Sequence, residues 1–71
     1  MADWSKEVFS TNVASIAYEE EGGRMFVTWL KGRRSVYSGV PEELALQAAS
    51  APSVGSFLNS EIKPNFAHHY E

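Results

Sequence analysis

The sequence predicts an α+β fold, a three-stranded antiparallel meander followed by two helices that pack on one face of the sheet. Two observations carry this prediction. Apolar residues alternate along residues 14–18, residues 24–30 are rich in β-branched and aromatic residues, and Gly-containing turns separate three strand-like runs. After Pro41 the apolar residues recur at helical spacing instead. The expected order is β-β-β-α-α, and the helices must cover one face of the sheet because neither layer can bury its apolar side alone.

Each of the three strands has its own signal. In the first, around residues 14–18, Ala14, Ile16 and Tyr18 alternate with polar or small residues. Gly22 and Gly23 then supply a turn. The second strand, residues 24–30, is rich in β-branched and aromatic residues. A turn centred on Gly32 leads to the third strand, residues 34–38, and such short connections favour antiparallel pairing.

Two helices are expected after the strands. Pro41 suits the first turn of a helix, and the following glutamates suit its positive end, which predicts a helix over residues 41–50. Ser53 is a suitable cap for a second helix, which the sequence ends at Lys63-Pro64. Residues 1–9 are expected to form a frayed N-terminal arm, residues 10–66 the domain, and residues 67–71 a mobile C-terminal tail.

Composition excludes several classes of protein. The 71 residues include no cysteine, so disulfides, thiolate chemistry and cysteine-based zinc sites are ruled out. No segment has the apolar stretch of a signal peptide or the roughly 20 apolar residues of a membrane helix, so the expectation is a soluble, cytoplasmic protein without a membrane partner. The net charge of −3 argues against a general affinity for nucleic acid.

The charge is nevertheless segregated, and this gives the best functional lead. Three of the six basic residues, Lys31, Arg33 and Arg34, lie in and beside one turn. Strand alternation places Arg33 and Tyr37 on the same side of the sheet, and Arg34 on the other. A guanidinium group next to an aromatic ring can hold a phosphate while the ring stacks on a base. The hypothesis is therefore an RNA- or nucleotide-binding site, with Lys31, Arg33 and Arg34 for phosphate and Tyr37 for stacking.

Two other interpretations stay open. The basic turn is also compatible with a solubilising hairpin tip, with Tyr37 packed against the helices. Alternatively, the domain binds another protein or a second copy of itself, through an edge of the sheet or through an exposed face that carries Phe26 and Leu30. Of the two candidate ligands, a nucleotide is more compatible than RNA with the net negative charge of the protein, because binding one phosphate-bearing small molecule needs fewer cations than binding a strand.

No pattern indicates catalysis, a metal or a cofactor. His68 and His69 are adjacent and point in opposite directions in an extended segment, with no third ligand nearby. The acidic residues 19–21 flank a turn, where they are expected to be solvated and to lack the desolvation that acid–base catalysis needs. The sequence contains no nucleophile, zinc or phosphate-loop motif of a known enzyme class. We therefore expect a non-catalytic accessory domain without a cofactor.

Four parts of the sequence together suggest a family: STNVASIAY (10–18), MFVTWLKGRRSVYSGVP (25–41), SVGSFLNSEI (53–62) and Phe66. They resemble the KTSC domain, a family named for its occurrence at the C-terminus of some lysyl-tRNA synthetases, which usually has a tyrosine at the position of Phe66. The resemblance implies a small stand-alone domain, for which RNA binding is suspected from the synthetase attachment. One departure affects the candidate site. The family's Tyr-x-Tyr signature reads Ser35-Val36-Tyr37 here, so only the second ring of a two-ring stacking platform is kept.

Overall fold

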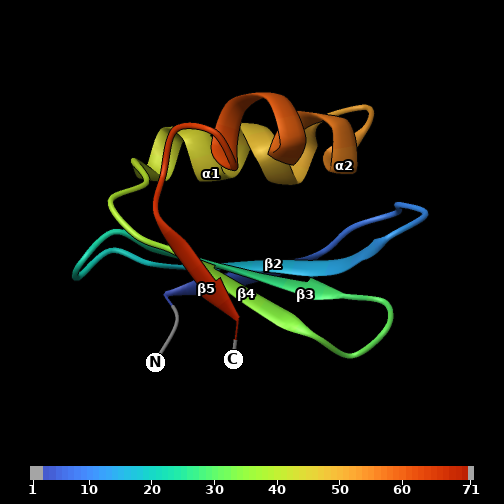
Figure 1. Ribbon diagram of the computed structural model, residues 1–71, viewed down its shortest axis with the longest axis horizontal. Helices are drawn as coiled ribbons and strands as arrows, with labels where there is room; N and C mark the ends of the chain where they lie inside the picture. The colour runs from blue at the N-terminus through green and yellow to red at the C-terminus, as the bar shows by residue number, and fades with distance from the viewer. Residues whose placement is uncertain (1–2, 71) are drawn as a thin grey trace.

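The computed structural model describes residues 3–70, which form a five-stranded antiparallel sheet with a layer of helices on one face (Figure 1). The strand order follows the chain, β1-β2-β3-β4-β5. The elements are β1 (Trp4–Glu7), β2 (Val13–Glu19), β3 (Arg24–Trp29), β4 (Arg34–Tyr37), α1 (Glu42–Ser50), α2 (Val54–Phe57), η1 (Leu58–Ile62) and β5 (His68–Tyr70). The α+β class is confirmed.

The predicted number of strands is wrong, because a further strand lies at each edge of the meander. β1 pairs with β2, with Trp4 opposite Tyr18, and β5 pairs with β4, with His68 opposite Tyr37. These strands are only four and three residues long and are mostly exposed, so they show no clear alternation. They pair because the edges of a three-stranded sheet would otherwise leave their backbone N–H and C=O groups without partners.

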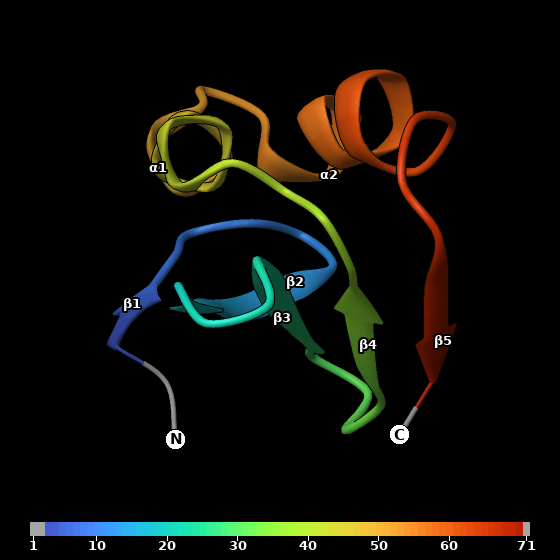
Figure 2. The ribbon, with the colours of Figure 1, turned by 90° about the vertical axis from the view of Figure 1, so that its left-hand side faces the viewer.

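The core lies between the sheet and the helices. Successive strands contribute side chains from one face, and the helices contribute small and aliphatic residues from above. Ala45 and Ala48 of α1 are fully buried, and such small side chains let a helix lie close to the sheet. Figure 2 shows α1 over the β1–β2 side of the sheet and the second helical segment over the β4–β5 side.

The second helical segment changes its geometry midway. α2 continues directly into η1, a π-helical turn in which the Lys63 N–H donates to the Leu58 carbonyl at 2.7 Å. Ser53 precedes α2, as expected for an N-cap, but its side chain makes no capping hydrogen bond. Instead its carbonyl accepts a hydrogen bond from the Phe57 N–H at 3.0 Å. Within residues 3–70 no helix combines the length and the apolar character needed to cross a membrane.

A buried hydrogen bond joins the sheet to the loop before α1. The Tyr18 hydroxyl donates to the Val40 carbonyl oxygen at 2.7 Å, and Tyr18 is only 3% exposed. Burial raises the pKa of Tyr18 above the usual 10.0, and the carboxylates of Glu42, Glu20 and Asp3 raise it further. As the pH rises past about 10, the folded state therefore keeps the Tyr18 hydroxyl proton that the unfolded chain loses. Its contribution to stability is fully present below about pH 10 and is lost as the pH rises through the folded pKa.

We predict that Tyr18→Phe lowers the free energy of unfolding by about 1 kcal/mol at neutral pH, because the Val40 carbonyl loses its donor. The difference from the unmodified protein should narrow above about pH 10, where ionised Tyr18 no longer donates. Urea unfolding of both proteins across this pH range measures the effect. A constant difference at all pH values would show that the Tyr18 hydroxyl does not control alkaline stability.

Candidate ligand-binding pocket

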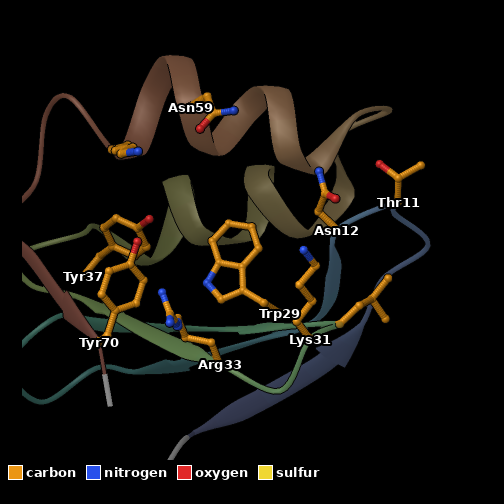
Figure 3. A pocket seen from close by; sticks show the side chains of 10 residues that line it. Thr11, Asn12, Trp29, Lys31, Arg33, Tyr37, Asn59 and Tyr70 are labelled. Carbon is orange, nitrogen blue, oxygen red and sulfur yellow. The ribbon is translucent and has the colours of Figure 1, made fainter.

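A pocket of about 710 Å³ lies between the sheet and the second helical segment, beside the tip of the β3–β4 hairpin (Figure 3). We call it the hairpin pocket. The sheet side of its lining comes from β3, the hairpin turn, β4 and β5, and the opposite side comes from η1 and the loop before β2. The lining residues are Thr11, Asn12, Trp29, Leu30, Lys31, Arg33, Tyr37, Asn59, Lys63 and Tyr70.

Three neighbouring strands each supply an aromatic ring to the hairpin pocket. Trp29 ends β3, Tyr37 ends β4 and Tyr70 ends β5. The two tyrosines are linked through His68, whose ring centroid lies 5.1 Å from that of Tyr37 and 5.8 Å from that of Tyr70. In Figure 3 the tyrosine rings stand together on one side of the pocket and the indole of Trp29 stands at its centre. The pocket therefore offers aromatic surface that suits a flat ring.

The indole of Trp29 is held in place by Ser35. Its Nε1–H donates to the Ser35 Oγ at 2.8 Å, and Ser35 is only 1% exposed. Because Nε1–H is the only polar group of an indole, this contact leaves the ring to act through its apolar surface. The orientation of the ring is set before any ligand arrives, which reduces the entropic cost of binding.

Three basic side chains line the same pocket, Lys31 and Arg33 from the hairpin and Lys63 from the end of η1. The Arg33 guanidinium carbon lies 4.9 Å from the centroid of the Tyr70 ring, a cation–π contact. No acidic residue is among the lining residues, although the whole chain has a net charge of −3. The pocket is therefore a local positive region of an acidic protein, suited to an anionic ligand.

Polar groups without charge complete the lining. Asn12 lies in the loop before β2, and Asn59 lies on η1, so the two amides reach the pocket from the side opposite the sheet (Figure 3). An amide carries both donors and an acceptor. Burial raises the pKa of Tyr37, and the neighbouring Tyr70 raises it further, so the Tyr37 hydroxyl is a neutral hydrogen-bonding group at physiological pH.

The residues singled out from sequence separate into two places. Lys31, Arg33 and Tyr37 come together in the hairpin pocket. Arg34 lies on the other face of the sheet, where its guanidinium carbon is 5.1 Å from the centroid of the Phe26 ring. Tyr37 is also a core residue, only 3% exposed, as the packing interpretation expected. With so little of its ring exposed, Tyr37 fits the packing interpretation, and the accessible aromatic surface of the pocket comes mainly from Trp29 and Tyr70.

Other lining residues were not predicted. The alternation already places Trp29 on one face of its strand, but the cross-strand relation to Ser35 needs the hairpin register. Asn59, Lys63 and Tyr70 come from distant parts of the chain, and no local pattern marks them as neighbours of the hairpin. His68 and His69 lie opposite Tyr37 and Val36 on successive positions of β5, so they face opposite sides of the sheet. Within residues 3–70 no group of three or more potential metal ligands is close enough to hold an ion.

Comparison with known proteins places the chain in a family. The model of the KTSC domain matches residues 9–66. The crystal structure of a KTSC domain protein from Yersinia pestis is similar to this one with a TM-score of 0.85 and 28% sequence identity, over 96% of each chain. No curated protein matches, and neither match names a lysyl-tRNA synthetase. Since the family model covers most of the sequence and the folds agree over nearly their full length, the chain belongs to the KTSC domain family.

Proposed function

We propose that this domain is a non-catalytic binding module that takes a nucleotide, either free or as a unit of RNA, into the hairpin pocket. The observation that carries the proposal is the combination of three aromatic rings and three cations in one pocket without an acidic residue. Nucleotides are the common ligands that present both a flat aromatic base and an anionic phosphate. The lining also has no carboxylate or imidazole to act as a general base, which favours binding over catalysis.

Each group of the lining has a part in this proposal. Lys31, Arg33 and Lys63 hold the phosphate by charge-assisted hydrogen bonds. The base stacks on the aromatic surface, where one such contact is worth about 1–3 kcal/mol. The amides of Asn12 and Asn59 lie opposite the sheet and hydrogen-bond the polar edge of the base or the sugar.

The alternative function, binding to another protein through the sheet, has weaker support. Both edges of the central meander are paired by β1 and β5 of the same chain, so a partner strand would have to add to one of these short end strands, four and three residues long. The Phe26 ring, expected to form an exposed patch, is half-buried with Arg34 over it. Leu30 remains 58% exposed and forms, with the fully exposed Phe9, part of a second, more apolar groove. That groove is the place where a protein partner would bind under the alternative.

We predict that Arg33→Ala weakens nucleotide binding about five- to tenfold, because it removes one charge-assisted contact to phosphate. Amide-shift NMR titration of the labelled domain with the four nucleoside 5′-monophosphates, at low and physiological salt, measures the affinity and shows where the ligand lies. The largest shifts are expected in the hairpin and in η1. Lys6→Ala is the charge-matched control, because Lys6 lies on β1 at the opposite edge of the sheet from β5.

Arg34→Ala tests whether the ligand lies in the hairpin pocket or contacts the hairpin on both faces of the sheet. Arg34 lies beside Phe26 on the face away from the pocket, so its removal should leave nucleotide affinity within about twofold of the unmodified domain. A loss as large as that of Arg33→Ala would mean that the ligand contacts the hairpin tip from both faces. Saturable binding that is equally insensitive to both substitutions would exclude the hairpin pocket as the site.

We further predict that Ser35→Ala lowers nucleotide affinity about fivefold, the equivalent of one lost hydrogen bond of about 1 kcal/mol. The indole of Trp29 loses its partner and its fixed orientation. In a Trp4→Phe background the emission of Trp29 should shift, which reports the change in its surroundings directly. Ser35→Thr keeps a hydroxyl and should restore both properties. An unchanged emission spectrum in Ser35→Ala would show that Ser35 does not position the indole.

A further inference from the structure

We infer that the ligand of the hairpin pocket is a free mononucleotide and not a strand of RNA. This inference rests on the proposed function, because it chooses between the two forms of ligand that the pocket chemistry admits. It comes from three features of the structure: where the remaining basic residues lie, where the acidic residues lie, and the size of the pocket.

The basic residues outside the pocket do not extend its positive surface along a path that a nucleic-acid backbone could follow. Lys6 lies on β1, at the opposite edge of the sheet from β5. Arg24 forms an ion pair with Glu19, with 2.6 Å between the Arg24 Nη2 and the Glu19 Oε1. Arg34 lies over the Phe26 ring on the far face. Proteins that bind single strands line a groove with cations that follow the backbone over several nucleotides. Among the described residues, no such line of cations leads out of the hairpin pocket.

The rest of the protein surface is strongly acidic. Among the described residues outside the pocket there are three basic and eight acidic residues, a formal charge of −5. Many of these acids gather at the end of the molecule opposite the β3–β4 turn, around the β2–β3 turn and the start of α1 (Figure 1). Two hydrogen bonds hold the N-terminal segment at this acidic end. The Glu20 N–H donates to the Asp3 Oδ2 at 2.6 Å, and the Trp4 Nε1–H donates to the Glu42 Oε2 at 3.1 Å. A strand that extended along the molecule would meet like charge.

The pocket also has the dimensions of a small-molecule site. Its volume of about 710 Å³ falls in the usual range for sites that enclose a single small ligand, roughly 300–1,000 Å³. The sheet bounds one side and η1 bounds the other, with Asn59 and Lys63 on the helical side. Three cations line this one pocket, and none of the described cations outside it extends the site toward a second nucleotide. Further nucleotides would add phosphates without adding protein contacts.

The inference is tested by comparing ligands of different length. Adenosine 5′-monophosphate and oligoadenylates of two and five units, each with one 5′-phosphate, are titrated into the labelled domain at several salt concentrations. If the site takes one nucleotide, the pentamer should bind about as tightly as the monomer, because only its 5′-terminal unit carries the phosphate monoester that the monomer presents. The slope of log affinity against log salt should be the same for all three ligands, because the number of neutralised phosphates does not change.

A pentamer that binds more than about tenfold more tightly than the monomer, with a steeper salt slope, would overturn the inference and leave the proposed function intact. If neither the pentamer nor any of the four nucleoside 5′-monophosphates shifts the amides of the hairpin and η1, the proposed function fails and the inference fails with it. Arg33→Ala is included with every ligand, so that binding outside the pocket is recognised by its insensitivity to this substitution.

Discussion

The turn at Gly32 determines which side chains meet in the hairpin pocket. Its φ of +93° is open to glycine and strained for other residues. The turn closes with two hydrogen bonds, from the Gly32 N–H to the Trp29 carbonyl at 2.9 Å and from the Trp29 N–H to the Arg33 carbonyl at 2.8 Å. A slip of one residue in this register would send Arg33 and Tyr37 to the far face and bring Arg34 to the pocket. The separation of the two adjacent arginines is thus a direct consequence of the hairpin geometry.

In this register, Ser35 stands at the position of the first tyrosine of the Tyr-x-Tyr pattern, and its contacts show which other aromatic residues take the place of that ring. Ser35 is small and buried, and its hydroxyl accepts the hydrogen bond that orients Trp29. In the pairing of β4 with β5, Ser35 lies opposite Tyr70, which lines the same pocket. The C-terminal strand therefore brings a second tyrosine ring beside the position where the pattern has its first. The aromatic lining of the pocket is thus assembled from three strands, whereas the Tyr-x-Tyr pattern would take both tyrosines from one strand.

The sequence predicts those parts of the fold whose signal is local. Apolar residues alternate in β2, β3 is rich in β-branched and aromatic residues, glycine turns bound the hairpins, and Pro41 with two glutamates marks the start of α1, so these elements are recognisable one at a time. The terminal strands are too short and too polar for alternation to show, and they are stabilised by pairing with β2 and β4. The same division holds for the site. Lys31, Arg33 and Tyr37 are close in sequence and were identified, whereas Lys63 and Tyr70 reach the pocket only because the tertiary fold brings η1 and β5 to the hairpin.

The separation of charge also shows why net charge is a poor guide to the ligand of so small a domain. The whole chain has a formal charge of −3, yet three cations line the pocket, while the other described residues have a formal charge of −5. Salt screens interactions between exposed charges beyond roughly 8–10 Å, and the longest dimension of the molecule is 29 Å. The acidic end therefore acts weakly on a small anion held at the hairpin, where the three nearby cations dominate. Under the proposed function, the same acidic surface would repel a longer polyanion, so one distribution of charge would favour a small phosphate ligand over a strand of nucleic acid.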